Sequence, residues 1–148
     1  MRVQLALNVE NLDEAVDYYS RLFGAEVNKR KPGYANFAIQ EPPLKLVLFE
    51  APGAAERLNH LGVETFEQRD VDEAAARFDA AGIKTAQESE STCCFATQNK
   101  AWSTDPQGMR WEWYKVLADE EAFGSTGHDT RIEPAAADPA CCVTPTDE

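Results

Sequence analysis

The sequence predicts an α+β fold made of two copies of a βαβββ module. Three observations predict it: two amphipathic helical segments with similar patterns, a short alternating strand before each helix, and candidate strands after each helix. Side by side, two such modules would form a curved mixed sheet around a cup, because each helix covers only one face of its strands. The length of 148 residues and the 43% hydrophobic content are typical of one globular domain.

The first module is predicted over about residues 1–52. Its helix has a capping-box pattern at Asn11 and Glu14 and is expected to end at Gly24, since glycine favours the left-handed conformation that closes many helices. Apolar residues alternate along the first strand and recur with helical spacing from Leu12 to Phe23. The candidate strands are residues 3–9, 25–29, 34–40 and 44–50.

The second module is predicted over about residues 57–117 and repeats this pattern. Leu61 and Val63 alternate in its first strand, and its helix is expected to start at a capping box of Asp70 and Glu73 and to end at Gly82. The polar segment 88–92 is predicted to be a loop or the entry to a strand. Further candidate strands are residues 83–87, 94–98, 101–104 and 110–116.

Residues 118–148 lack a periodic apolar pattern and are predicted to form an acidic, mostly disordered tail. The whole chain carries a formal net charge of -12, so nucleic acids and anionic membranes are not expected partners. No apolar run is as long as a membrane span, and the first residues lack a signal-peptide pattern, which predicts a cytoplasmic protein. In a reducing compartment, four cysteines are expected to be thiols, metal ligands or reactive groups.

A candidate metal site follows from superposing the two modules. Gln4 then falls on the same face as His60, and Glu112 lies between two tryptophans on the last strand. A buried carboxylate has to be paired with a cation or bound to a metal. Amide, imidazole and carboxylate ligands would suit iron, manganese, nickel or zinc with positions left open. The alternative has Gln4 facing solvent, His60 hydrogen-bonded in the core and Glu112 paired with Arg110.

The cysteines form two adjacent pairs, Cys93 with Cys94 and Cys141 with Cys142. Neighbouring residues of a regular strand face opposite sides, so Cys93 and Cys94 can share a ligand only in a loop. Two thiolates favour a thiophilic partner such as trivalent arsenic, cadmium, zinc or copper(I). The alternative is that they are small buried residues without a role. Lys100, after this segment, could place a positive charge near an oxygen-bearing substrate, but the expected role is that of a solvated turn residue. Tyr34 and Asn36 share a strand face that could line the cup, with sheet packing as the alternative.

The repeated module, the candidate metal ligands and the cysteine pair together make the sequence resemble the vicinal oxygen chelate superfamily. This superfamily includes glyoxalase I, bleomycin-resistance proteins and extradiol dioxygenases. More closely, it resembles the arsenic- and cadmium-inducible branch that contains the ArsI-type carbon–arsenic lyases. The resemblance covers about residues 1–117 and is carried by residues 3–9, 31–39, 41–48, 58–64 and 92–94.

The resemblance implies an Fe(II)- and O2-dependent enzyme that cleaves the carbon–arsenic bond of trivalent organoarsenicals, such as methylarsonous acid and aromatic arsenicals, to arsenite. It implies Gln4, His60 and Glu112 as metal ligands, with His60 and Glu112 also taking part in catalysis, and Cys93 and Cys94 as the substrate thiols. Other divalent metals such as nickel, cobalt, manganese or zinc could occupy the site in the isolated protein. Phe95 stands where the lyases often have tyrosine, a departure that bears on substrate range.

Two other functions compete with arsenical cleavage. A non-catalytic protein that sequesters cadmium or arsenite would need the thiols but not Gln4, His60 or Glu112. A glyoxalase-like isomerase or antibiotic-binding module would have no use for Cys93 and Cys94. The chain is expected to be a monomer or a homodimer.

Cys141 and Cys142 are candidate auxiliary thiols that bind the arsenical and transfer it to Cys93 and Cys94. We predict that truncation at Asp119 raises the substrate concentration for half-maximal rate and leaves the maximal rate unchanged. Steady-state arsenite release measures both constants, and an unchanged half-saturation concentration would contradict the transfer role.

Overall fold

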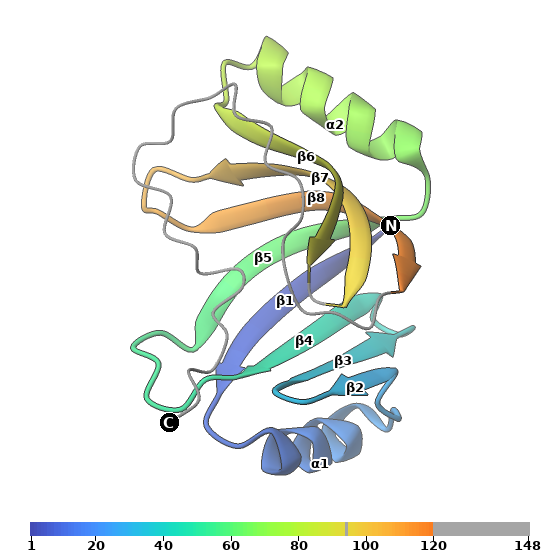
Figure 1. Ribbon diagram of the computed structural model, residues 1–148, viewed down its shortest axis with the longest axis vertical. Helices are drawn as coiled ribbons and strands as arrows, with labels where there is room; N and C mark the ends of the chain where they lie inside the picture. Colours follow the sequence, from blue (N-terminus) through green and yellow to red (C-terminus); the bar gives the residue numbers. More distant parts are fainter. Residues whose placement is uncertain (94, 120–148) are drawn as a thin grey trace. The chain divides into compact units, whose positions relative to one another are not determined.

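The computed structural model describes residues 1–93 and 95–119, and its elements follow the order β-α-β-β-β twice (Figure 1). This order confirms the predicted α+β fold with a repeated module. The first copy contains β1 (Arg2–Val9), α1 (Leu12–Phe23), β2 (Lys29–Lys31), β3 (Tyr34–Ile39) and β4 (Leu44–Glu50). The second contains β5 (Leu58–Thr65), α2 (Gln68–Ala80), β6 (Thr85–Cys93), β7 (Ala96–Thr104) and β8 (Arg110–Asp119).

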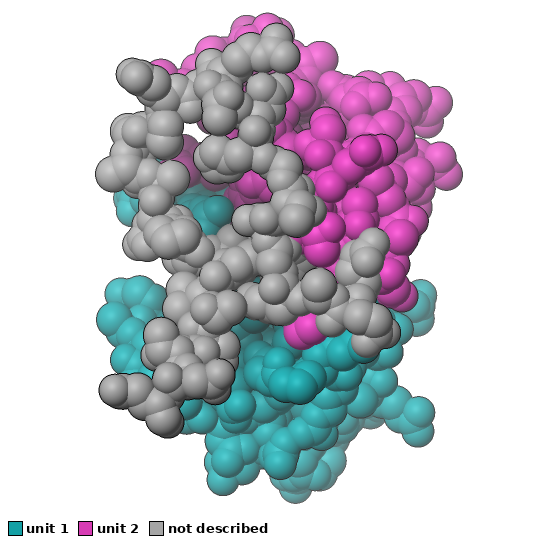
Figure 2. Space-filling view, viewed as in Figure 1, with its two compact units in different colours: residues 1–64, 105–111 teal, residues 65–104, 112–148 magenta. Residues whose placement is uncertain are grey.

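Two compact units divide the chain, and they do not coincide with the two copies of the module (Figure 2). Unit 1 consists of residues 1–64 and 105–111, and unit 2 consists of residues 65–104 and the chain from residue 112. Almost all of β5 therefore belongs to unit 1, although it opens the second copy. The reason is that β5 pairs along its length with β1 in an antiparallel ladder.

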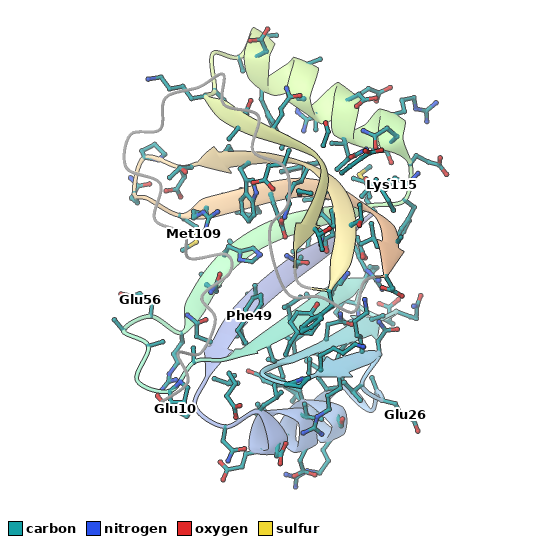
Figure 3. All side chains as sticks on the ribbon, viewed as in Figure 1. Glu10, Glu26, Phe49, Glu56, Met109 and Lys115 are labelled. Carbon is teal, nitrogen blue, oxygen red and sulfur yellow. The ribbon has the colours of Figure 1, made fainter. Side chains whose placement is uncertain are left out.

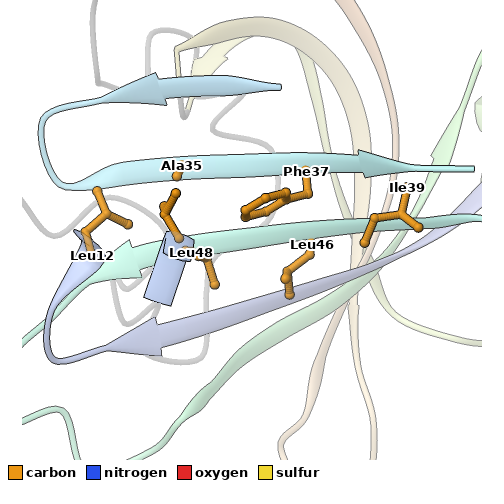
Figure 4. Packing of buried hydrophobic residues seen from close by; sticks show 7 residues of the cluster. Leu12, Ala35, Phe37, Ile39, Leu46 and Leu48 are labelled. Carbon is orange, nitrogen blue, oxygen red and sulfur yellow. The ribbon is translucent and has the colours of Figure 1, made fainter. Parts of the chain in front are cut away.

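In unit 1 the strands follow the order β2-β3-β4-β1-β5, with β1 parallel to β4 and antiparallel to β5. Helix α1 packs on one face of this sheet, and buried apolar side chains fill the space between them (Figure 4). Phe37 and Leu46 are almost inaccessible to solvent, and burial of a side chain of this size contributes about 2 kcal/mol. The cluster consists of Leu12, Val16, Ala35, Phe37, Ile39, Leu46 and Leu48.

Helix α1 begins and ends where the sequence predicts. The Asn11 side chain accepts a hydrogen bond from the backbone N–H of Glu14 at 3.0 Å, and Gly24 closes the helix with φ at 59°. The next strand differs from the prediction of 25–29, because Ala25 and Val27 pack against the core outside any strand. β2 forms only over Lys29–Lys31, where it pairs with β3 across the turn at Gly33.

The predicted start of the second helix is wrong, whereas its predicted end is confirmed. Helix α2 begins two residues before Asp70, its N-cap is Glu67, and no side chain caps it. Asp70 instead lies in the first turn, where its charge favours the helix dipole. At the other end Gly82 has a φ of 68°, and the N–H of Ile83 bonds to the carbonyl of Phe78, as in a glycine-terminated helix.

In unit 2 the strands follow the order β8-β7-β6, and α2 contacts β6 and β7. Segment 88–92, predicted as a loop or strand entry, lies within β6, and residues 96–98 of the first predicted segment join segment 101–104 in the single strand β7. β6 lies at the end of the strand order, where a polar strand can remain exposed and so resembles a loop in the sequence. β8 continues to Asp119, just past the predicted start of the tail, and residues 120–148 lie outside the described residues.

No helix within the described part of the chain is long and apolar enough to cross a membrane.

A buried charge cluster joins three strands of unit 1. Glu64 of β5, only 5% exposed, forms ion pairs with Arg2 of β1 and with Lys45 of β4, whose Nζ lies 2.6 Å from Glu64 Oε1. Burial raises the pKa of the Glu64 carboxyl, but Lys45 and Arg2 together outweigh burial and hold that pKa below its usual range. The carboxylate form therefore stabilises the folded state at neutral pH.

We predict that Glu64→Gln lowers the free energy of unfolding by about 3 kcal/mol at pH 7, because two cations then lose their buried counter-charge. A carboxyl with a lowered pKa stabilises the fold above its ordinary pKa and loses this contribution as the pH falls through its folded-state value. The free energies of unfolding of the wild type and the variant, measured with urea and compared across pH, should therefore converge as the pH falls below about 4. A difference independent of pH would contradict this role.

Candidate functional site

The pairing of β1 with β5 brings together two of the residues singled out by the sequence. Gln4 Nε2 lies 3.0 Å from His60 Nε2, and the two residues are 4% and 2% exposed. Ala6 stands opposite His60 in the ladder, and Gly62 stands opposite Gln4, so small residues flank the two polar side chains. The predicted approach of Gln4 to His60 is therefore found, and the alternative of a solvent-facing Gln4 is not.

An irregularity in the ladder lies directly beside His60. His60 pairs with Ala6 and Leu58 pairs with Leu7, so Asn59 is an extra residue in β5. In a regular strand the side chains of Asn59 and His60 would face opposite sides of the sheet. Here Asn59 Oδ1 lies 2.7 Å from His60 Nδ1, because a bulge can re-aim a side chain toward its neighbour.

A line of hydrogen bonds continues from Asn59 away from the histidine. Asn59 Nδ2 donates to Asn8 Oδ1 at 2.9 Å, and Asn8 Nδ2 donates to the backbone carbonyl of Glu56 at 2.9 Å. Glu56, labelled in Figure 3, lies in the loop that precedes β5. Sequence reasoning missed Asn8 and Asn59, because in a regular strand Asn59 would face away from His60.

Aromatic and amide side chains lie near this pair in unit 1. Phe49 on β4 is labelled in Figure 3. The centre of its ring lies 6.3 Å from the centre of the His60 ring and 5.6 Å from the centre of the Tyr34 ring. Asn36 donates to the Tyr34 hydroxyl at 2.8 Å and accepts from Asn28 at 2.9 Å. Tyr34 and Asn36 are buried on one strand face, and their role in lining a cup stays a prediction.

Glu112 lies on β8 in unit 2 and is 4% exposed. Its Oε2 is 4.0 Å from Nζ of Lys100, which also lies 3.7 Å from Glu88 Oε2 and 5.5 Å from the centre of the Trp102 ring. The expectation that Lys100 is a solvated turn residue is wrong: it lies within β7 and is 3% exposed. The reason is that the two segments predicted on either side of it form one strand.

The structure gives the cysteines only in part. β6 ends at Cys93 and β7 begins at Ala96, while Cys94 lies outside the described residues. Cys141 and Cys142 lie outside them as well. Binding of a thiophile by these side chains stays a prediction.

Residues 1–93 and 95–119 contain no group of three or more histidine, cysteine or acidic side chains placed to hold a metal ion. Glutamine is not one of these residue types, and its amide oxygen can ligate a metal. The Gln4 amide lies beside the buried imidazole of His60, and metal binding by this pair stays a prediction.

Comparison with known proteins decides the family. The model of the Glyoxalase/Bleomycin resistance protein/Dioxygenase superfamily matches residues 2–113. The chain belongs to this superfamily. The repeated β-α-β-β-β order is thus the superfamily fold, and the resemblance drawn from the sequence is confirmed.

Within the superfamily two relatives are similar over most of the chain. The cadmium-induced protein CadI of Mycobacterium tuberculosis is 61% identical over 124 residues, which cover 84% of this chain and 82% of CadI. The trivalent organoarsenical cleaving enzyme of Thermomonospora curvata is 46% identical over 147 residues, which cover 99% of this chain and 90% of the enzyme.

Among solved structures, the Mn(II)-bound glyoxalase of Novosphingobium aromaticivorans has a TM-score of 0.57 at 21% identity. The match covers 79% of this chain and 39% of that protein. At this identity the likeness supports the superfamily fold alone.

Proposed function

We propose that the chain is an Fe(II)- and O2-dependent enzyme that cleaves the carbon–arsenic bond of trivalent organoarsenicals. The observation that carries the proposal is the buried Gln4–His60 pair in a chain 46% identical, over 99% of its length, to a trivalent organoarsenical cleaving enzyme. The superfamily contains dioxygenases, which supports oxygen chemistry on this fold.

The donor chemistry of the proposed ligands fits a divalent metal. Gln4 offers an amide oxygen, His60 an imidazole nitrogen and Glu112 a carboxylate, all from buried residues. One imidazole, one carboxylate and one amide resemble the facial triad of non-haem iron enzymes, with an amide in place of the second histidine. The grouping of Glu112 with the other two rests on the resemblance and on the repeated module. When bound, Fe(II) would supply activation of dioxygen.

The protein's own groups would bind and orient the substrate. The thiols of Cys93 and Cys94 would form two arsenic–sulfur bonds and displace the two hydroxyl groups of a trivalent arsenical as two molecules of water, which would hold its carbon substituent in place. The proposed reaction of methylarsonous acid with one molecule of dioxygen gives arsenous acid and formaldehyde. The carbon–arsenic bond breaks, carbon gives four electrons to dioxygen, arsenic remains trivalent, and no further reductant is needed.

We predict that Glu112→Ala reduces arsenite release from methylarsonous acid and the coupled oxygen uptake by at least about 100-fold. Loss of a residue that only orients a metal ligand already costs about 10–100-fold, so loss of a ligand should cost no less. The measurement uses anaerobic Fe(II) loading, then addition of substrate and air.

Glu88→Ala is the matched control, because Glu88 and Glu112 are both carboxylates near Lys100. If Glu112 acts only as a counter-charge for Lys100, the two variants should lose activity to a similar degree. We expect the Glu88 variant to retain most of its activity. Equal losses would contradict a metal-binding role for Glu112.

A second function is favoured by the 61% identity to a cadmium-induced protein: thiol-based sequestration of cadmium or arsenite. Sequestration needs Cys93 and Cys94 but not His60. We predict that His60→Ala abolishes arsenite release and leaves Cd(II) affinity within about twofold, whereas Cys93→Ser with Cys94→Ser lowers both. Cd(II) titration measures the affinity. If the wild type binds Cd(II) and methylarsonous acid but releases no arsenite, the result would instead support sequestration.

A further inference from the structure

We propose that Asn59, held in place by Asn8, is a positioning residue that keeps His60 protonated at Nδ1 and leaves the lone pair on Nε2 for a divalent metal. The inference rests on the metal-binding role proposed above for His60. It concerns residues of unit 1 alone, and each step follows from a hydrogen bond whose direction is fixed by its neighbours.

The donor and acceptor roles along this line of hydrogen bonds are set by the backbone carbonyl of Glu56, which can only accept a hydrogen bond. Asn8 must therefore present its Nδ2 to that carbonyl at 2.9 Å, which turns its Oδ1 toward Asn59. Asn59 must then present its Nδ2 to Asn8, which leaves Asn59 Oδ1 to face His60. An amide oxygen can only accept, so at 2.7 Å the His60 Nδ1 has to be the donor.

A neutral imidazole protonated at Nδ1 has its lone pair on Nε2. In this structure the Nε2 atom lies 3.0 Å from Gln4 Nε2, so the Gln4 amide donates to it. A metal at His60 Nε2 would displace this N–H. A half-turn of the same carboxamide would present Gln4 Oε1, the atom that can ligate a metal. Gln4 would then change from hydrogen-bond donor to ligand without leaving its place on β1.

The bulge in β5 is the feature that makes this arrangement possible. In a regular ladder, Asn59 would lie on the face of the sheet opposite His60 and could not reach its ring. A metal-binding histidine usually donates its second ring N–H to such a partner, which fixes the tautomer and the orientation of the ring. The geometry therefore assigns Asn59 a role toward the metal, and Asn8 a role in fixing the orientation of the Asn59 amide.

The first test is the tautomer of His60 in the metal-free protein, measured by nitrogen-15 NMR of the imidazole nitrogens. The chain has only two histidines, so His128→Gln leaves His60 as the sole signal. We expect the His60 ring to be protonated at Nδ1 and unprotonated at Nε2. Protonation at Nε2 of the neutral ring would overturn the proposal, and this outcome needs no variant at Asn59 to fold.

The second test compares Co(II) affinity in variants of the hydrogen-bond line. Asn59→Ala should lose the fixed tautomer and bind Co(II) about 10–100-fold more weakly. Asn59→Asp keeps an acceptor for Nδ1 and should retain both properties, while Asn8→Ala should fall between the two. Asn28→Ala is the control, because it removes an asparagine that bonds to Asn36 and has no described bond to His60. It should leave tautomer and affinity unchanged.

The two tests separate this inference from the proposed function. An Asn59→Ala protein that folds and keeps wild-type tautomer and Co(II) affinity would overturn the positioning role while leaving the metal site intact. Failure of the wild type to bind Co(II) would overturn the metal site, whatever tautomer His60 adopts. Loss of tautomer and affinity in Asn59→Ala, with both restored by Asn59→Asp, would support the two together.

Discussion

The antiparallel ladder between β1 and β5 is the interaction on which the candidate site depends. It joins the first strands of the two repeated modules and places Gln4 beside His60 at a position where neither side chain reaches solvent. Buried polar groups are costly unless each finds a hydrogen-bond partner. The ladder meets this need through one continuous line of bonds, which runs from Gln4 through His60, Asn59 and Asn8 to a backbone carbonyl. The same line gives the imidazole a defined orientation.

Much of this arrangement could be predicted from the sequence, because its causes are local or repeated. Helix α1 is bounded by Asn11 and Gly24, whose capping properties act within one turn of the chain. The match of strand and helix in both modules was enough to align Gln4 with His60 across 56 residues of sequence. The superfamily followed from the same pattern together with the residues that carry the resemblance, and the family comparison confirms it.

Other features depended on pairing that a single strand does not encode. The bulge at Asn59 arises from the register between β1 and β5, so the proximity of Asn59 to His60 has no periodic signature. The polar segment 88–92 of β6 is predicted from its composition as a loop or strand entry, although pairing with β7 keeps it extended. Lys100 was placed on a turn for the same reason, whereas β7 passes through it and buries its side chain beside Glu88 and Glu112. In each case a contact distant in sequence outweighs local composition.

We propose that His60 is a metal ligand through Nε2 and not only a hydrogen-bonded core residue. The most direct measurement is proton NMR of the Co(II)-loaded protein in H2O and in D2O. A cobalt-bound imidazole that keeps its second N–H gives a strongly shifted exchangeable signal, which disappears in D2O. The account predicts one such signal from His60, retained in His128→Gln and absent in His60→Ala. A Co(II)-loaded protein without a shifted imidazole N–H, or with one that survives His60→Ala, would contradict it.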